Sequence, residues 1–211
     1  MIDLSVYNRA GKEVDVLKVD ELLLGGEVRY SLLKQAIVMY HANKRVGTAE
    51  TKSRGMVEGS TRKIYAQKHT GNARAGTVRT GKRVGGGVTF AKITRDFSKD
   101  MPKKQRLLAR DSAILAKLLS NDIVVVDELK FEKPHTSDFA SVLDNLKVER
   151  SCLVAIGGYD DNIYRSARNI PKVVVMPVIE LNAGDICSHH KILFTKEAFL
   201  SLLNKDRKGE N

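Results

Sequence analysis

Hydrophobic residues follow a regular period at both ends of the chain and none in the middle. Residues 2–16 alternate apolar and polar positions on either side of an Asn-Arg-Ala-Gly turn at 8–11, which predicts a β-hairpin. The pair Gly25-Gly26 ends this segment. Apolar residues at helical spacing then predict one helix over about 28–43 and another over about 102–120.

Beyond the second helix, short apolar strands alternate with helices. The strands are expected at 123–126, 152–156, 173–178 and 192–194. The first helix is expected to be capped by Thr136 or Ser137 and to carry Phe139, Val142, Leu143 and Leu146. The others are expected at 163–169, as a short turn at 182–188, and after Thr195, which caps the last one. Because this alternation is typical of crossover connections, we expect an α/β fold with a doubly wound, mainly parallel, Rossmann-like sheet.

The middle segment, residues 44–95, has a different composition. It holds nine of the sixteen glycines, no Leu and no Pro, and its apolar residues follow no period. Such a segment buries too little apolar surface to offset its conformational entropy by itself. We therefore expect a globular domain formed by 1–43 and 96–211, with 44–95 inserted as a long extended loop.

The charge of the chain is concentrated in the same segment. Residues 44–95 contain 13 Lys or Arg and 2 Asp or Glu, which accounts for the whole net charge of +11. A solvated linker would not need eleven charges that repel one another, whereas a segment that binds a polyanion would. We call residues 44–95 the basic arm and expect it to bind nucleic acid.

The remaining composition narrows the class of protein. The longest apolar run, Val173–Ile179, is far shorter than the roughly 20 residues of a membrane-spanning helix, so no membrane association is expected. The N-terminal residues do not have the layout of a signal peptide. Two cysteines cannot form a disulfide framework and suggest a reducing compartment.

No motif indicates catalysis, a cofactor or a metal. Gly76–Arg83 resembles a phosphate-binding loop, but Arg83 stands where the Mg²⁺-binding hydroxyl is needed and no strand or helix is expected beside it. Gly157-Gly158 is a lone glycine pair after a strand, which is more typical of a turn. The Cys187–His190 cluster, even with Cys152, falls short of the four converging ligands of a zinc site.

Several motifs resemble, in order and spacing, the L-four family of bacterial large-ribosomal-subunit proteins (universal name uL-four). They are Thr51–Arg54, Gln67–Arg74, Gly76–Arg79, Gly85–Phe90, Pro102–Lys104 and Ser166–Asn169. The chain departs from the family pattern at a few places. His69 stands where the family has Gly, Tyr65 lies in place of Trp, and Thr80–Lys82 and Ala91–Ile93 replace stretches that contain Pro.

The resemblance implies a structural constituent of the large ribosomal subunit, in the cytoplasm, with no enzymatic activity. Its partners would be the 23S-type ribosomal RNA, other large-subunit proteins including L-twenty-two, and the nascent peptide. The family binds RNA early in assembly, its globular domain lies on the outer face of the subunit, and its loop tip helps to line the peptide exit tunnel. The tip residues at the matched positions are Tyr65, Gln67, Lys68, His69, Thr70 and Gly71.

The predicted RNA contacts are the cations of the basic arm and the first two of the helix that follows it. They are Lys44, Arg45, Lys52, Arg54, Arg62, Lys63, Lys68, Arg74, Arg79, Lys82, Arg83, Lys92, Arg95, Lys103 and Lys104. Two other hypotheses stay open at this stage. One is an RNA-modifying enzyme that grips RNA with the arm, and the other is a translational regulator that binds messenger RNA.

Overall fold

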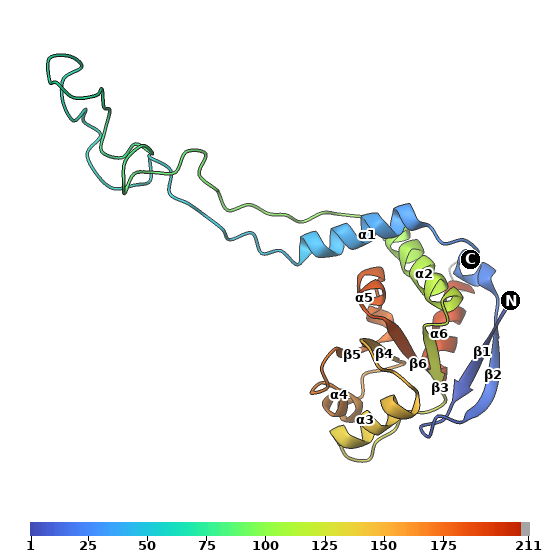
Figure 1. Cartoon of the computed structure of the whole chain (residues 1–211). Helices are drawn as coiled ribbons and strands as arrows, with labels where there is room; N and C mark the ends of the chain where they lie inside the picture. The colour runs from blue at the N-terminus through green and yellow to red at the C-terminus, as the bar shows by residue number, and fades with distance from the viewer. Residues whose placement is uncertain (208–211) are drawn as a thin grey trace. The chain divides into compact units, whose positions relative to one another are not determined.

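The computed structural model describes residues 1–207, with side chains through Asn204. Contacts divide the chain into two units, shown in Figure 1. The first, here called the body, contains Met1–His41 and the chain from Asp100 onward. The second, here called the arm unit, is Ala42–Lys99.

The body contains all six strands and nearly all of the helical residues described. The strands are β1 Ile2–Tyr7, β2 Glu13–Val19, β3 Ile123–Val126, β4 Cys152–Ile156, β5 Val173–Pro177 and β6 Lys191–Thr195. The helices are η1 Glu21–Leu24, α1 Tyr30–Asn43, α2 Lys103–Leu119, α3 Thr136–Asn145, α4 Asp161–Ala167, η2 Val178–Glu180, α5 Ala183–Ser188 and α6 Lys196–Arg207. None of these helices is both long enough and apolar enough to cross a lipid bilayer.

The strands form one sheet in the order β2-β1-β3-β6-β4-β5. Only β1 and β2 pair antiparallel, as the hairpin predicted over 2–16, and the remaining neighbours pair in parallel. Strand β6, the last in sequence, lies between β3 and β4, so strands far apart in the chain are neighbours in the sheet. The prediction of an α/β fold with a mainly parallel sheet is confirmed.

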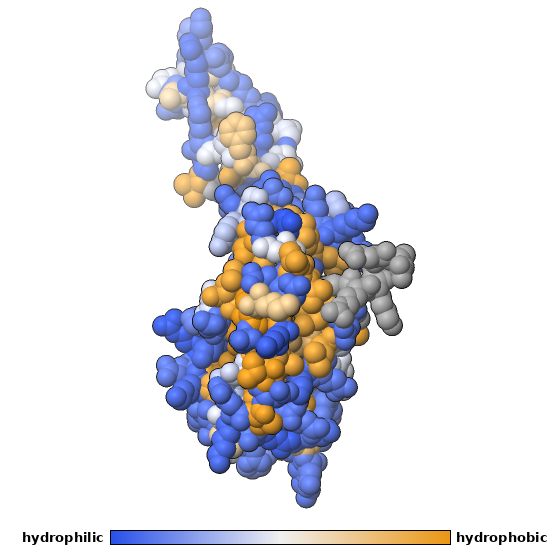
Figure 2. All heavy atoms as spheres, turned by 90° about the vertical axis from the view of Figure 1, so that its right-hand side faces the viewer, coloured by the Kyte–Doolittle hydropathy of each residue, from blue (hydrophilic) through white to orange (hydrophobic). Residues whose placement is uncertain are grey.

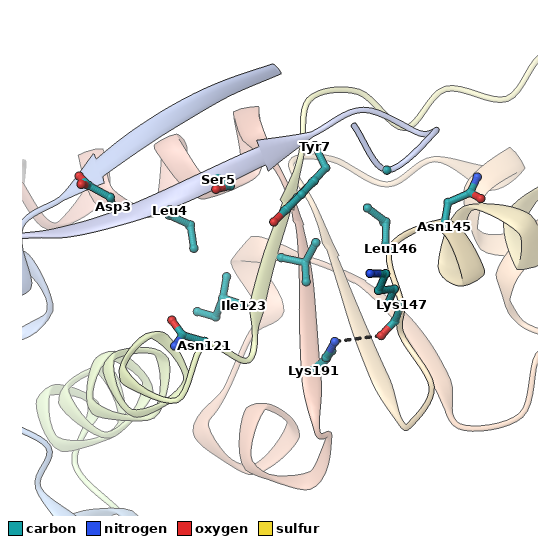
Figure 3. A pocket seen from close by; sticks show the side chains of 12 residues that line it. Asp3, Leu4, Ser5, Tyr7, Asn121, Ile123, Asn145, Leu146, Lys147 and Lys191 are labelled. Atoms are coloured by element: carbon teal, nitrogen blue, oxygen red, sulfur yellow. Dashed lines mark hydrogen bonds between the residues drawn. The ribbon is translucent and has the colours of Figure 1, made fainter. Parts of the chain in front are cut away.

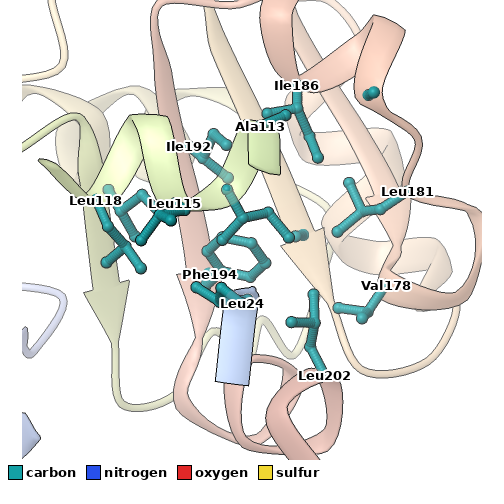
Figure 4. Close-up of a cluster of buried hydrophobic side chains, with 14 of the residues drawn as sticks. Leu24, Ala113, Leu115, Leu118, Val178, Leu181, Ile186, Ile192, Phe194 and Leu202 are labelled. Carbon is teal, nitrogen blue, oxygen red and sulfur yellow. The ribbon is translucent and has the colours of Figure 1, made fainter. Parts of the chain in front are cut away.

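The alternation of side chains along the central strands produces two hydrophobic cores. In β6, Ile192 and Phe194 belong to one core, whereas Leu193, between them, belongs to the other. The first core lies against α1, α2, α5 and α6 and contains the side chains drawn in Figure 4. The second lies against α3 and α4. Both faces of the central strands are therefore buried, which explains why these strands are almost wholly apolar.

The β1–β2 hairpin leaves part of its surface to solvent. Val14 and Val16 on β2 are 58% and 52% exposed, and Leu22 of η1 is 77% exposed. On the face seen in Figure 2, hydrophobic side chains gather over this region of the body.

Asn8 shapes the turn of the hairpin, because its Oδ1 accepts hydrogen bonds from the amides of Ala10 and Lys12.

The boundaries of three predicted helices were wrong in detail. Helix α1 begins at Tyr30 rather than 28. Helix α3 begins at Thr136 with His135 as its N-cap, so neither Thr136 nor Ser137 caps it. Helix α4 is Asp161–Ala167 rather than 163–169, because the Asp160 carboxylate accepts hydrogen bonds from the next helical amides and starts the helix earlier.

Other helix ends follow the sequence closely. Pro102 directly precedes α2, and Asn43 is the last residue of α1. The hydroxyl of Thr195 accepts a hydrogen bond from the amide of Ala198 at 3.4 Å, so Thr195 caps α6 as predicted while also ending β6. The two short helices η1 and η2 were not predicted.

Candidate nucleic-acid interface

The basic arm has no helix or strand. Its outgoing leg runs from residue 44 to the tip around 65–71, and its returning leg runs from the tip to residue 95. Backbone hydrogen bonds connect the two legs. The amide of Thr51 donates to the carbonyl of Lys92 at 3.0 Å, and the amide of Val88 donates to the carbonyl of Lys52 at 2.9 Å. Within the returning leg, the amide of Gly87 donates to the carbonyl of Arg79 at 3.0 Å. These bonds satisfy backbone groups that would otherwise need water.

Glycine is required at position 87, where the returning leg packs against the backbone of the outgoing leg. A Cβ on Gly87 would lie 2.2 Å from the amide nitrogen of Arg54 and 2.4 Å from its Cα. Both of these atoms belong to the backbone, so no side-chain rotation could relieve the overlap. At this point the glycine permits close packing of backbone on backbone.

A second set of bonds closes the tip. The amide of Ile64 donates to the carbonyl of Gly76 at 3.1 Å, and Lys63 Nζ donates to Gln67 Oε1 and to the carbonyl of Ala75. The Tyr65 hydroxyl donates to the carbonyl of Ala73. Because Lys63 and Tyr65 have hydrogen-bond partners across the tip, both side chains help to fix the shape of the loop. Lys63 was predicted to contact RNA, and Tyr65 was predicted to lie at the tunnel-side tip.

His69 stands at the end of the tip in the left-handed region, with φ of 68°. A non-glycine residue seldom adopts this conformation, although His is among those that do so more often. This is the position at which the resembled family has Gly. Glycine adopts this left-handed conformation without strain, and the His69 side chain is exposed.

All but one of the predicted RNA contacts within the arm are exposed. The exception is Arg79, which is half-buried. Arg79 Nη1 donates to the carbonyl of Val57 at 3.0 Å and also contacts that of Gly55 at 3.5 Å, so this side chain joins the two legs. Lys103 and Lys104 are exposed as well, but they belong to the body, on the first turn of α2.

The base of the arm unit contains residues that the sequence analysis missed. Phe97 is half-buried, and the guanidinium carbons of Arg45 and Arg95 lie over its ring, 4.0 and 4.3 Å from the ring centroid. Asn43 exchanges two hydrogen bonds with the backbone of Lys99. A lone Phe two residues after an Arg, in a segment poor in aromatic residues, was the available signal.

The body offers a hollow of about 450 Å³ between the β1–β2 hairpin, β3 and the end of α3, shown in Figure 3. Its charged lining residues are Asp3, Lys147 and Lys191, and Lys191 Nζ donates to the carbonyl of Lys147 at 2.9 Å. A single carboxylate beside two lysines does not form an acid–base pair of the kind that hydrolytic or transfer chemistry needs.

Neither cysteine lines the hollow of Figure 3. Cys152 is fully buried in β4, and this burial raises the pKa of its thiol to about 12. Cys187 lies in α5 and is exposed, but partial desolvation of its thiol by neighbouring atoms raises the pKa of this group too. Both groups therefore stay protonated near neutral pH, which disfavours the thiolate that nucleophilic catalysis and zinc binding use.

Residues 17–205 match the model of the Ribosomal protein L4/L1 family. The chain belongs to this family. It is 43% identical over 197 residues to the Large ribosomal subunit protein uL4 of Dehalococcoides mccartyi, covering 93% of this chain and 94% of that protein. The proteins of the same name from Rhodopirellula baltica and Carboxydothermus hydrogenoformans are 43% and 40% identical, over 94% and 96% of this chain and 90% and 98% of their own lengths.

Membership confirms the resemblance found in the sequence motifs and identifies the chain as a ribosomal protein. The relatives are named as components of the large ribosomal subunit, so the alternative of an RNA-modifying enzyme gains no support. The predicted location in the ribosome agrees with this family.

Proposed function

We propose that this chain is a structural constituent of the large ribosomal subunit that binds large-subunit ribosomal RNA through its basic arm. The observation that carries the proposal is the arrangement of the arm. Twelve of its thirteen cations are exposed on a backbone whose legs are joined by their own hydrogen bonds, and it contains only two acidic residues. A row of exposed cations on a preformed support is suited to RNA phosphates.

The exposed cations divide into two roles by position. Those on the legs, such as Lys52, Arg54, Lys82 and Arg83, face solvent beside backbone that is already paired. We infer that they position the arm on RNA phosphates as an extended loop during assembly. The residues outside the basic arm carry no net charge. The doubly wound body that they form would anchor the base of this loop.

The tip has a different expected role. Lys68, His69 and Thr70 are exposed beyond the bonds that close the loop at Lys63 and Tyr65. We infer from the family that this tip helps to line the exit tunnel, opposite the loop of protein L-twenty-two and beside the nascent peptide. A charge there would act strongly on a passing peptide, because limited water screens poorly.

The arm's role in binding is tested by its salt dependence. If about six phosphates are neutralised, the log–log slope of affinity against salt for a ribosomal RNA fragment should be near −4 to −6. A variant in which residues 50–90 are replaced by a Gly/Ser linker of equal length should lose most of this slope. Its circular dichroism should show that the body remains folded. An unchanged slope would move the binding surface to the body and overturn the proposal.

The RNA target is tested by crosslinking in cells followed by sequencing of the bound RNA. Large-subunit ribosomal RNA should dominate the crosslinks, and these should depend on the arm. Crosslinks confined to messenger RNA would favour the translational regulator instead.

The tip is tested by comparing Lys68→Glu with Lys82→Glu, which make the same change of charge on the tip and on a leg. Lys68→Glu should assemble normally but change macrolide sensitivity or peptide-dependent stalling. Lys82→Glu should lower the yield of complete large subunits. If Lys68→Glu altered neither drug response nor stalling, the tunnel role of the tip would be wrong.

A further inference from the structure

Two arginines from opposite legs share one aromatic ring at the base of the arm unit. The guanidinium carbon of Arg45 lies 4.0 Å from the centroid of Phe97, and that of Arg95 lies 4.3 Å from it. Both arginines are exposed, whereas Phe97 is half-buried. The face of an aromatic ring attracts a guanidinium, and stacking leaves the N–H groups at the guanidinium edge free to bond elsewhere.

This arrangement brings two positive charges close together. Because the two guanidinium carbons lie 4.0 and 4.3 Å from the same ring centroid, they are at most about 8 Å apart, which is about one Debye length at physiological salt. An arginine cannot relieve the repulsion by losing its proton. Among the residues whose side chains the structure describes, neither guanidinium forms an ion pair with a carboxylate, and the neighbouring Asp96 accepts hydrogen bonds from Ser98. Within this part of the chain, the pair therefore has no counter-charge in contact with it.

The backbone holds the two legs at the spacing that this pair requires. The amide of Arg95 donates to the carbonyl of Gly47 at 3.3 Å. A Cβ on Gly47 would lie 2.1 Å from the carbonyl oxygen of Arg95 and 3.1 Å from Cδ2 of Phe97. Any side chain at this position would push the ring and the second leg away from the first.

The pair borders a hollow that could admit an anionic group. Its volume is about 610 Å³, larger than one phosphate needs and sufficient for a short stretch of sugar and phosphate. Besides the two arginines and Phe97, the lining includes Thr48, Thr94 and Lys92. Two threonine hydroxyls and a third cation complete a set of donors of the kind that binds phosphate oxygens.

We propose that Arg45 and Arg95, stacked on Phe97, form a clamp for one backbone phosphate of RNA, with Phe97 as its positioning residue. The proposal rests on the proposed function, since the RNA bound by the arm supplies the phosphate. Each arginine has a fork of N–H donors that can bind two oxygens of a phosphate. Stacking on the Phe97 ring holds both forks in place before RNA binds.

The test measures the affinity of the full chain for a ribosomal RNA fragment over a range of salt. Phe97→Leu keeps every charge and most of the apolar volume, yet it should lower affinity about 3–10-fold and make the salt slope shallower by about one phosphate. Phe97→Tyr, which keeps the ring, should restore both values. Arg45→Gln with Arg95→Gln should cause at least as large a loss, and adding Phe97→Leu to that pair should change little.

Two further variants keep the test decisive. Arg83→Gln removes an exposed cation elsewhere on the arm, and in that background Phe97→Leu should retain its full effect. Arg45→Lys with Arg95→Lys keeps the charges but removes the forks, so it should also lose affinity even if Phe97→Leu disturbs the base of the arm.

Unchanged affinity and slope in both Phe97→Leu and the double lysine variant would overturn the clamp. The proposed function would survive that result if replacement of residues 50–90 still removed most of the slope. It would fail only if the slope persisted without the arm.

Discussion

Asn43 and Lys99 close the arm unit through two hydrogen bonds, although 56 residues separate them in the chain. Asn43 Nδ2 donates to the carbonyl of Lys99 at 3.2 Å, and the amide of Lys99 donates to Asn43 Oδ1 at 2.8 Å. One side chain at the end of α1 thus serves both backbone groups of the returning leg. The base of the arm is closed by a specific pair and not by its covalent connections alone.

Replacing Asn43 with Ala should loosen this closure. The variant leaves the amide and the carbonyl of Lys99 without these partners, at a cost of about 1 kcal/mol, so the Lys99 amide should exchange with solvent roughly fivefold faster. Native-state hydrogen exchange measures this directly. Asn72→Ala, an exposed position at the tip, serves as the control and should leave Lys99 unchanged. Equal exchange in both variants would contradict the closure.

Replacing Gly87 with Ala should separate the legs. The new Cβ would meet the backbone of Arg54, so the bonds of Val88 to Lys52 and of Gly87 to Arg79 should weaken together. Affinity for ribosomal RNA should fall about tenfold or more, and trypsin should cut faster at Arg54, because the preformed support is lost. Gly55→Ala, whose nearest neighbour would lie 3.8 Å away, should behave like the wild type. Similar behaviour of the two variants would mean that leg contact is unimportant.

Replacing Gly184 with Ala should destabilise the body. The added Cβ would lie 2.8–3.0 Å from the ring and Cβ of Tyr40, which packs α1 on α5 and cannot move without shifting its helix. We expect a loss of about 1–3 kcal/mol in the free energy of unfolding, typical of an overpacked site. Chemical denaturation gives this value. The matched change Gly158→Ala, where nothing lies within 4 Å, should cost far less.

The two thiols should differ in reactivity. With a pKa of about 12, only about one Cys152 in ten thousand is a thiolate at pH 8, and its burial also blocks access. Cys187 is exposed, and its pKa is raised less, so iodoacetamide at pH 8 should label it first. Cys187→Ser should leave the native protein unlabelled until it unfolds. Labelling of that variant in native buffer at the rate of a free thiol would show that β4 opens readily.

The pH dependence of stability follows from the same thiol. Because folding raises the pKa of Cys152 above its ordinary value, the unfolded state loses this proton first as pH rises. The stability contributed by the buried neutral thiol is therefore complete below about pH 9 and declines between about pH 9 and 12. Cys152→Ala should flatten this part of the stability curve, which denaturation at several alkaline pH values would reveal.

Much of the body was determined by local sequence alone. The apolar runs at Ile123–Val126 and Cys152–Ile156 are strands because β-branched residues buried on both faces favour extended backbone. Thr195 and Asn182 start helices because their side chains accept hydrogen bonds from amides three residues onward. The concentration of cations in the basic arm is likewise a property of composition, independent of the fold.

Only the tertiary structure decided what depends on contacts between distant residues. The place of β6 between β3 and β4 follows from packing of both sheet faces, and no local pattern contains that order. Within the arm unit, the exposed cations could be predicted as a class. Arg79 connects the two legs because the returning leg brings its side chain beside the carbonyl of Val57, which the sequence could not show. Phe97 gained its role for the same reason, since Arg45 reaches its ring from 52 positions away in the chain. Periodicity and charge act between neighbours in sequence, whereas these contacts arise when two legs fold back on each other, where glycine lets the backbones approach.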